Sequence, residues 1–342
     1  MAYRATLILG DGIGPEVTAA TQRVIEAAGV KIDWEVARAG LGVLKETGNA
    51  LPKETLDSLI RNKLGLKGPT DTPLGEGHRS ANVELRMKLD LYANIRPVKI
   101  IPGQITPFKD VDIVVFRQGT EDIYIGEERW VDDAHTIAEA VSRISKFESE
   151  RIFRHAFEYA TKHGRKKVTC AHKANILKLT QGLFLNAGRS ISARYPDIVF
   201  QDRIVDNMAK ELVMYPSEYD VIVLTNMFGD ILSDECAGLV GGLGFTPGAN
   251  IGEGVALFEA VHGTAPDIAG QNKANPSALI LSAVMMLEHI GESEAAKKIR
   301  ESVYQVVFEG RVVTGDAHLL HRVGKPASTT EMTDEIIRKV QS

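Results

Sequence analysis

The chain has 342 residues, of which 44% are hydrophobic and 25% charged, so it is long enough for two domains with cores of their own. A net charge of −5 and a pI near 6.0 exclude the basic field that binds nucleic acid or an anionic membrane surface. No apolar run reaches the roughly 18 residues of a membrane span, and the N-terminus has no signal-peptide pattern. Two cysteines, Cys170 and Cys236, are too few for a disulfide framework or a zinc site, so we expect a reducing, cytoplasmic location.

A glycine-rich loop at residues 10–16 joins a predicted apolar strand at 5–9 to a helix that ends near residue 28. The loop is similar to the dinucleotide fingerprint G-x-G-x-x-G, but its third glycine comes one residue too early. Asp11 and Glu16 would also repel a pyrophosphate. We therefore predict a tight strand-to-helix turn and not a phosphate cradle of the usual kind.

Three arginines stand in the elements that follow. The pattern predicts a strand at 33–38, a helix after Pro52, an irregular loop at 67–77, a helix at 78–90 and strands at 91–97 and 112–117. Arg86 lies in the second of these helices, and Arg96 and Arg117 lie in the last two strands. Because guanidinium groups bind carboxylates through two parallel hydrogen bonds, three that converge would suit a polycarboxylate. The alternative is three surface arginines with unrelated ion pairs.

The middle of the chain contains two further residues of interest, Lys173 as a possible catalytic residue and Asp206 as a possible helix N-cap. The pattern predicts an exposed hairpin-like segment at 123–134, a helix at 146–163, strands at 167–171 and 198–205, and helices that begin near 172 and at 206. An exposed apolar protrusion is often an oligomer contact. Lys173, at a strand-to-helix junction, is either catalytic or a solvated surface lysine, and Asp206 is a candidate N-cap.

A predicted buried parallel strand at 220–225 leads into a segment with two acidic residues. Gly229 permits a sharp turn, and residues 231–240 are then predicted as a helix. Asp230 and Asp234 are four residues apart, so they share one face of its first turn. Two carboxylates so close repel each other unless a cation such as Mg²⁺ lies between them. Alternatively, Asp230 caps the helix and Asp234 is solvated.

The C-terminal third is predicted to contain a glycine-rich connection at 238–252, a strand at 255–259, an irregular loop at 260–270, and helices at 276–289, 292–309 and 329–341. Strands alternate with helices along the whole chain, and the sequence shows neither an internal repeat nor a linker. This alternation predicts an α/β fold with helices on both faces of a sheet.

Several motifs together carry a resemblance to a known family. They are Gly-Asp-Gly-Ile-Gly-Pro-Glu (10–16), Leu-Tyr-Ala-Asn-Ile-Arg-Pro (91–97), Glu-Asp-Ile-Tyr (121–124), His-Lys-Ala-Asn (172–175), residues 226–234, Gly-Gly-Leu-Gly (241–244) and His-Gly-Thr-Ala-Pro (262–266). In this order they resemble the β-decarboxylating dehydrogenases, the isocitrate/isopropylmalate dehydrogenase family, over essentially the whole chain. The resemblance implies a fold other than the standard Rossmann fold, with a large nucleotide-binding α/β domain (1–98 and 242–342) and a small inserted α/β domain (99–241). It also implies a clasp near 123–145 and a homodimer whose active sites are shared between subunits.

The resemblance further implies roles for particular residues. Tyr124 and Lys173 would transfer protons, and which of Lys173 and Asp206 takes the first proton stays open. Mg²⁺ or Mn²⁺ would be held by Asp230, Asp234 and, from the second subunit, Asp206. The substrate contacts would be Ser80, Asn82, Arg86, Arg96 and Arg117. The contacts to NAD would be Thr72, Glu259, His262, Gly263, Asp267, Ile268 and Asn275.

The start of the Arg86 helix bears on the substrate. Family members that act on isopropylmalate resemble one another in carrying apolar residues there, whereas this chain has Ser80-Ala-Asn82. A polar group left unpaired beside an isopropyl group would cost about 1–3 kcal/mol. We therefore expect oxidative decarboxylation of isocitrate to 2-oxoglutarate and CO₂, with homoisocitrate and 3-isopropylmalate as the alternative substrates.

Asp267 bears on the nucleotide, because a carboxylate accepts hydrogen bonds from both ribose hydroxyls and repels a 2′-phosphate. Relatives that use NADP resemble one another in carrying a Lys-Tyr type pair where Asp267-Ile268 stands, so we expect NAD. The alternative to an enzyme is a non-catalytic regulatory subunit. Because the chain has all the proton-transfer, metal-binding and arginine residues of the family, the sequence argues against this alternative. The chain departs from the family pattern at Gln118-Gly119, where Glu-Asn is usual, and at Asp71, where threonine or lysine is more common.

Overall fold

The computed structural model describes residues 2–72, 80–104, 106–317 and 325–342. Within these ranges the strands are β1 (Tyr3–Ile8), β2 (Ile32–Ala37), β3 (Leu64–Lys67), β4 (Ala93–Lys99), β5 (Asp112–Gln118), β6 (Glu128–Trp130), β7 (Ala138–Ala140), β8 (Lys167–His172), β9 (Val199–Ile204), β10 (Val221–Leu224), β11 (Pro247–Ile251) and β12 (Ala256–Ala260). The α-helices are α1 (Gly14–Ala27), α2 (Leu41–Thr47), α3 (Lys53–Asn62), α4 (Ala81–Lys88), α5 (Lys146–Lys162), α6 (Thr180–Ser192), α7 (Val205–Met214), α8 (Asn226–Leu239), α9 (Ser277–His289), α10 (Ser293–Glu309) and α12 (Thr329–Gln341). Short 3₁₀-helices are η1 (Ile123–Ile125), η2 (Pro216–Glu218) and η3 (Leu243–Phe245). None of these helices combines the length and the apolar composition needed to cross a membrane.

Ten strands form one mixed sheet in the order β2-β1-β3-β12-β11-β4-β5-β10-β8-β9. The strands on either side of the middle are parallel to their neighbours, from β2 to β12 and from β5 to β9. In the middle, β11 is antiparallel to both β12 and β4, and β4 is antiparallel to β5. The predicted parallel strand before Asp230 is β10, which is fully buried. The α/β class is therefore confirmed.

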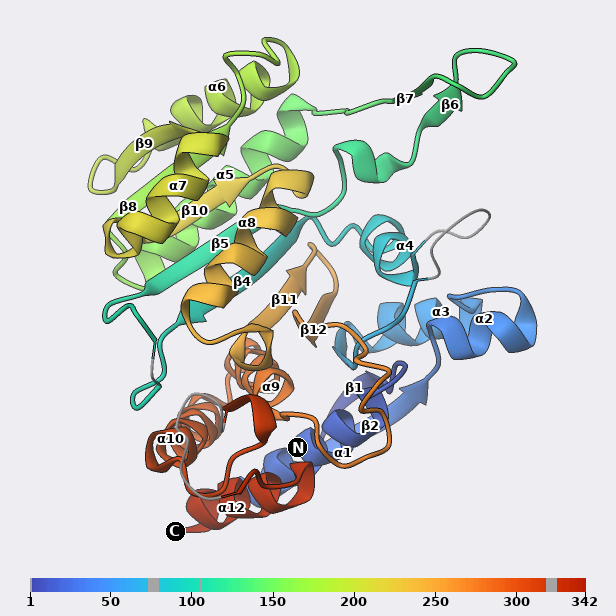
Figure 1. Cartoon of the computed structure of the whole chain (residues 1–342), viewed down its shortest axis with the longest axis vertical. Coiled ribbons are helices and arrows are strands. Elements are labelled where there is room, and N and C mark those ends of the chain that lie inside the picture. The colour runs from blue at the N-terminus through green and yellow to red at the C-terminus, as the bar shows by residue number, and fades with distance from the viewer. Residues whose placement is uncertain (1, 73–79, 105, 318–324) are drawn as a thin grey trace.

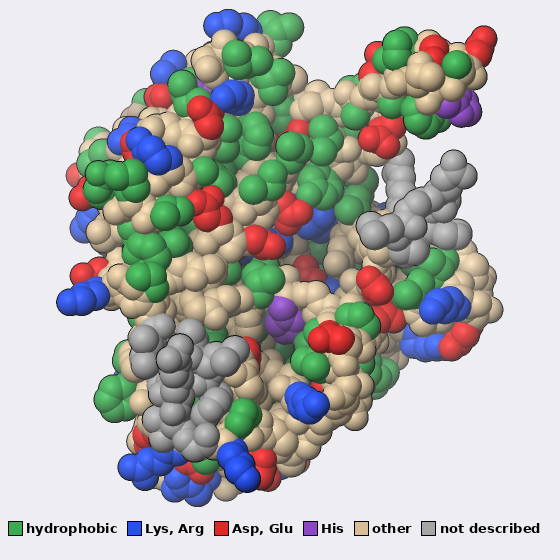
Figure 2. All heavy atoms as spheres, viewed as in Figure 1, with side chains coloured by type: hydrophobic (Ala, Val, Ile, Leu, Met, Phe, Trp, Pro, Cys, Tyr) green, Lys and Arg blue, Asp and Glu red, His purple; other side chains and the backbone are tan. Residues whose placement is uncertain are grey.

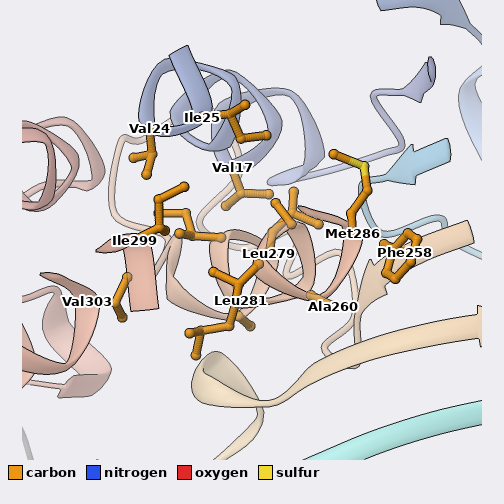
Figure 3. Close-up of a cluster of buried hydrophobic side chains, with 14 of the residues drawn as sticks. Val17, Val24, Ile25, Phe258, Ala260, Leu279, Leu281, Met286, Ile299 and Val303 are labelled. Atoms are coloured by element: carbon orange, nitrogen blue, oxygen red, sulfur yellow. The ribbon is translucent and has the colours of Figure 1, made fainter. Parts of the chain in front are cut away.

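Helices cover both faces of the sheet (Figure 1). On the half with β1, β3 and β12, the largest hydrophobic core packs α9 against α1 and α10, with Val17, Leu279 and Ile299 among its members (Figure 3). On the other half, β5 serves two cores, because its residues alternate between the faces of the sheet. Val114 packs into the core under α5 and α6, whereas Val115 packs into the core under α7 and α8. Each half of the sheet thus has hydrophobic packing of its own, and the antiparallel pair β4 and β11 runs between the halves.

The hairpin β6–β7 projects away from the rest of the molecule (Figure 1). Its two strands pair antiparallel, and Trp130, Val131 and Ile137 are each more than half exposed. The predicted hairpin-like segment is therefore present, but it continues to Ala140, beyond the predicted limit at residue 134.

The prediction of a turn at Gly229 is wrong. Helix α8 begins at Asn226, so Gly229 lies inside the helix. A Cβ atom at this position would lie 2.6 Å from the Cγ atom of Arg117 on β5. The glycine therefore allows α8 to approach the sheet closely, and Asp230, which follows it inside the helix, is not a cap.

Two predicted helix starts are also wrong. Helix α6 begins at Thr180, so Lys173 lies in the turn that follows β8. Helix α7 begins at Val205 with Ile204 in the N-cap position, so Asp206 is not its N-cap. Strands β3 and β11 and helix α2 were not among the predicted elements. Strand β11 forms despite its Pro-Gly start because hydrogen bonds from β12 and β4 stabilise it on both sides.

The loop at residues 10–16 is a tight turn, as predicted, with Gly10 and Gly12 at φ values of 78° and 56°. The carboxylate of Asp11 accepts hydrogen bonds from the first two peptide groups of α2, at 2.8 and 2.9 Å. It also accepts one from the backbone N–H of Asp71, at 2.9 Å. The carboxylate thus holds three segments of the chain together.

Candidate active site

Three arginines from different elements meet beside Tyr124. Arg86 lies on α4, Arg96 on β4 and Arg117 on β5, and each is less than one-tenth exposed. The guanidinium carbons of Arg86 and Arg117 lie 5.8 and 5.0 Å from the centroid of the Tyr124 ring. Arg96 and Arg117 both contact the carboxylate of Asp230. The alternative of three unrelated surface ion pairs is therefore wrong.

Helix α8 presents Asp230 and Asp234 to these arginines. Arg96 donates to both carboxylates, with Nη2 at 3.4 Å from Asp230 Oδ1 and Nη1 at 3.3 Å from Asp234 Oδ1. Arg117 donates to the same oxygen of Asp230, and the Tyr124 hydroxyl donates to Asp230 Oδ2 at 2.6 Å. Figure 2 shows acidic and basic side chains close together around a hollow in this face of the molecule. Asp230 thus connects the arginines with the tyrosine.

The surroundings of these groups shift their pKa values. Burial lowers the pKa of Arg117, and the two neighbouring arginines lower it further, to about 9, so the guanidinium stays charged at neutral pH. Burial raises the pKa of Asp230, but Arg117, the hydrogen bond from Tyr124 and Arg96 outweigh burial and leave this pKa lowered. The pKa of Asp234 is raised by burial, which Arg96 only partly offsets and Asp230 reinforces. A cation between the two carboxylates would favour the ionised form of both.

Lys173 and Asp206 form a separate ion pair on this chain. Lys173 Nζ donates to the Asp206 carboxylate, and the two side chains are 29% and 67% exposed. The turn that carries Lys173 is held by His172, whose Nδ1 accepts the N–H of Ala174 at 3.0 Å and whose Nε2 lies 3.2 Å from Asp202 Oδ2. Among the described residues, no three His, Cys, Asp or Glu side chains lie close enough to hold a metal. A contribution of Asp206 to the site on α8 would therefore have to come from a second subunit.

Ser80 and Asn82 lie at the start of α4, next to a neighbouring loop. Ser80 occupies the N-cap position without a side-chain capping hydrogen bond, so it is not an ordinary N-cap. Its Oγ accepts a hydrogen bond from Thr72 Oγ1 at 3.0 Å. Asn82 Oδ1 accepts one from Thr70 Oγ1 at 2.9 Å. Polar side chains therefore lie together at the N-terminal end of α4, the helix that carries Arg86.

A cavity of about 900 Å³ lies on the half of the molecule that contains β1 and α9. Four of the residues expected to contact NAD line it, namely His262, Gly263, Ile268 and Asn275. Three others do not line it, namely Thr72, Glu259 and Asp267. Asp267 is exposed beside Ile268, whereas Glu259 on β12 contacts Lys67 and Asn250.

His262 lines this cavity, and one of its ring nitrogens is a buried acceptor. Its Nδ1 lies 3.0 Å from the carbonyl oxygen of Gly263, which only accepts, so Nδ1 carries the proton. Burial lowers the pKa of His262, so the ring is neutral and Nε2 is an acceptor. Within the described part of the chain, this buried Nε2 has no hydrogen-bond partner. Asn275, by contrast, already donates to Asp316 and accepts from the N–H of Ser277, each at 2.9 Å.

The cluster also contains residues that the sequence analysis did not single out. Asn94 Oδ1 and Ser233 Oγ accept hydrogen bonds from Arg96 at 2.7 and 2.6 Å. Asn226 Oδ1 accepts one from Arg117 Nε at 2.8 Å. Asn94 could have been found, because it stands two residues before Arg96 and so shares its face of the strand. Ser233 and Asn226 depend on how α8 packs against β5, which the spacing does not reveal.

The structure thus combines a mixed ten-stranded α/β fold, buried guanidiniums around two carboxylates of one helix, and a large cavity elsewhere. This arrangement is suited to a small polyanion and a second ligand. The chain belongs to the isocitrate/isopropylmalate dehydrogenase family, whose sequence profile matches residues 4–336. It is 48% identical over 338 residues to a mitochondrial regulatory subunit of isocitrate dehydrogenase (NAD) from Dictyostelium discoideum, covering 98% of this chain and 92% of that protein. It is 47% identical over 333 residues to the mitochondrial catalytic subunit 5 of isocitrate dehydrogenase (NAD) from Arabidopsis thaliana, covering 97% and 87%. The crystal structure of isocitrate dehydrogenase from Methylococcus capsulatus matches with a TM-score of 0.96 and 50% identity, over 99% of this chain and 100% of that one.

These similarities confirm the family resemblance and the expected fold class. The prediction of a cytoplasmic location is wrong, because the relatives from Dictyostelium and Arabidopsis are both named mitochondrial. There is also a physical reason why the sequence could not identify the compartment. A chain with two free buried cysteines fits any reducing compartment, so cysteine content could not distinguish one such compartment from another.

Proposed function

We propose that this chain catalyses the NAD-dependent oxidative decarboxylation of isocitrate to 2-oxoglutarate and CO₂. The observation that carries the proposal is the convergence of Arg86, Arg96 and Arg117 beside Asp230. Three buried guanidiniums suit a ligand with several carboxylates. Ser80, at the start of the adjoining helix α4, has a polar side chain. It therefore suits a ligand that places a polar group there and not an isopropyl group.

The carboxylate oxygens on α8 are suitable ligands for a hard divalent cation. Asp230 and Asp234 offer carboxylate oxygens on one helical face, and the raised pKa of Asp234 is what a nearby cation would relieve. They would hold Mg²⁺ or Mn²⁺ together with Asp206 of a second subunit. When bound, such a cation polarises the hydroxyl of a 2-hydroxy acid and stabilises negative charge on the same oxygen.

The residues of the chain itself would bind, orient and exchange protons. The arginines hold the substrate carboxylates, so that the hydroxyl-bearing carbon faces the nicotinamide. Burial raises the pKa of Tyr124, and its hydrogen bond to Asp230 raises it further, so the phenol keeps its proton at neutral pH. Tyr124 can therefore donate a proton to the carbon that loses CO₂. Lys173 or Asp206, which form an ion pair with each other, would accept the proton of the substrate hydroxyl.

The large cavity supports NAD as the second ligand. The unpartnered acceptor of His262 suits the amino group of adenine, and Asp267 stands on the adjacent exposed turn. A carboxylate there disfavours the extra phosphate of NADP. The double substitution Asp267→Lys and Ile268→Tyr should shift the ratio of kcat/KM values towards NADP. An unchanged ratio would remove Asp267 from the nucleotide site.

A homodimer with shared active sites would bring Lys173 and Asp206 of one subunit to the α8 helix of the other. Large apolar side chains that such a dimer would cover are exposed on the hairpin and near Lys173, including Trp130 at 54%, Ile176 at 66% and Leu179 at 85%. The division into a large domain (1–98 and 242–342) and a small domain (99–241) with its clasp near 123–145 belongs to the same proposal. The separate hydrophobic cores on the two halves of the sheet support it.

A kinetic panel on the purified chain tests this function against its alternatives. The rate of NAD reduction would be measured with isocitrate, homoisocitrate and 3-isopropylmalate, each with and without Mg²⁺ or Mn²⁺. The proposal predicts the highest kcat/KM for isocitrate. A preference for either other acid would reassign the substrate, and no turnover with any acid would favour a regulatory role, which is the one named for the Dictyostelium relative.

A further inference from the structure

A row of buried hydrogen bonds leads from Arg96 into the sheet. Arg96 Nε donates to Asn94 Oδ1, Asn94 Nδ2 donates to Asn250 Oδ1, and Asn250 Nδ2 donates to Glu259 Oε1, each at 2.7 Å. Asn94 and Asn250 are directly paired residues of β4 and β11, and they are only 2% and 1% exposed. At the far end, Lys67 Nζ lies 2.7 Å from Glu259 Oε2. The row therefore has a guanidinium at one end and a paired carboxylate at the other.

The charges at the two ends fix the direction of every bond in this row. A guanidinium Nε only donates, so the oxygen of Asn94 faces Arg96 and its amide nitrogen faces Asn250. Burial raises the pKa of Glu259, but Lys67 and the hydrogen bond from Asn250 outweigh burial, so this group is an ionised acceptor. Turning either amide round would set two donors or two acceptors against each other, at the cost of buried unpaired groups. Each asparagine therefore has a single orientation.

The other side of the guanidinium faces the proposed substrate site. While Nε is held by Asn94, Nη1 and Nη2 point to α8, where they contact Asp234 and Asp230. We propose that Asn94 and Asn250, anchored by Glu259, are positioning residues that fix the plane of the Arg96 guanidinium for a substrate carboxylate. This inference rests on the proposed function for its kinetic test. Neither asparagine needs to touch the substrate to act in this way.

The variant Asn250→Leu tests the inference, because it removes the middle of the row and leaves Arg96 and Asn94 in place. We expect kcat/KM for isocitrate to fall about 10- to 100-fold, mostly through a higher KM, since Arg96 already binds the substrate in the ground state. Asn62→Leu is the matched control. The amide of Asn62 also donates to a carboxylate, Glu35, at 3.0 Å, but on α3 away from the cluster. Equal kinetics for the two folded variants would overturn the inference.

A second variant separates positioning from a loss of packing. In Asn250→Asp, the new carboxylate still accepts from Asn94 but faces Glu259, and the two can bond only if one of them takes up a proton. We expect its kcat/KM for isocitrate to recover relative to the wild type as the pH falls from about 8 to about 6. Adding Glu259→Gln reverses the direction of that bond and should restore KM for isocitrate at the higher pH. If neither the lower pH nor the added Glu259→Gln substitution restores the kinetics of Asn250→Asp, the inference is overturned.

A measurement without substrate distinguishes failure of this inference from failure of the proposed function. Hydrogen exchange of the Arg96 Nε–H, assigned by NMR with the help of Arg96→Lys, reports the bond to Asn94 directly. We expect exchange to be at least about 10-fold faster in Asn250→Leu than in the wild type, and unchanged in Asn62→Leu. If isocitrate is not turned over but exchange accelerates, the function is wrong and the positioning holds. If exchange does not change, the positioning is wrong.

Discussion

Replacing Gly229 by alanine tests how closely α8 must approach β5 for Arg117 to reach Asp230. The new Cβ would lie 2.6 Å from Cγ, 2.7 Å from Cβ and 3.2 Å from Cα of Arg117. Two of these atoms are fixed by the strand, so Arg117 cannot avoid the contact by rotating its outer side chain. Alanine favours a helix interior by about 1 kcal/mol over glycine, whereas overpacking a buried site costs about 1–3 kcal/mol. We therefore expect the free energy of unfolding to fall by up to about 2 kcal/mol.

Gly238→Ala, on the same helix, is the matched control for this substitution. Gly238 is exposed, and among the described residues no heavy atom lies within 4 Å of an added Cβ. Its substitution should raise the free energy of unfolding by about 0.5–1 kcal/mol. Urea unfolding at one fixed protein concentration compares the two, and KM for isocitrate should rise only for Gly229→Ala. If both alanines stabilise equally and leave KM unchanged, the close packing of α8 on Arg117 does not position the site.

Three further perturbations address the buried charges. Lys67→Met leaves the mostly buried carboxylate of Glu259 without its cation, although Asn250 still donates to it, so the free energy of unfolding in urea should fall by up to about 3 kcal/mol. A loss below about 1 kcal/mol would contradict the pairing. The lowered pKa of Asp230 stabilises the fold above its ordinary pKa near 4, and this contribution is lost as the pH falls through the folded pKa. Tyr124→Phe removes one cause of the lowering, so its destabilisation in urea should be larger at about pH 6 than at about pH 3. Chelation of divalent cations should abolish NAD reduction by isocitrate, and a rate that survives the chelator would remove the α8 carboxylates from the role of metal ligands.

The elements predicted best are those whose hydrophobic pattern is decided locally. The last helix was predicted with the observed limits, Thr329 and Gln341, because Ser328 and Glu331 form a capping box that fixes its start. The strand before Asp230 was found because it is apolar throughout. Strand β11 was missed for the opposite reason. Its sequence, Pro-Gly-Ala-Asn-Ile, has little preference for a strand, and only its neighbours in the sheet make it one.

The site shows the same division between local and long-range information. Spacing placed Asp230 and Asp234 on one helical face, and that geometry is present. Spacing could not show why Gly229 is a glycine, because the reason is the side chain of Arg117 on another element. The pairing of Asn94 with Asn250 joins residues 156 positions apart, and it exists only once β11 has been placed beside β4. Sequence analysis therefore found charged residues by type, whereas the neutral residues that orient them emerged only from the fold.

The balance of charge in the cluster also bears on which acid it binds. The guanidiniums of Arg86, Arg96 and Arg117 exceed the carboxylates of Asp230 and Asp234 by one positive charge. Lys173 and Asp206 of a second subunit would cancel each other. When a divalent cation is also bound, the three negative charges of a tricarboxylate make the site neutral. The two negative charges of the dicarboxylate 3-isopropylmalate leave a net charge of one positive unit. Because net charge is costly to bury, this balance favours the tricarboxylates isocitrate and homoisocitrate over 3-isopropylmalate.

Arg86→Gln reverses that balance, because the site without this charge is neutral with a dicarboxylate and carries one excess negative charge with a tricarboxylate. We expect the ratio of kcat/KM for isocitrate to that for 3-isopropylmalate to fall at least about 10-fold, or roughly 1.4 kcal/mol of differential binding. Asn62→Leu, outside the cluster, should leave the ratio unchanged. If Arg86→Gln weakens both acids by the same factor, charge balance does not select the substrate, and the polar groups at the start of α4 must do so.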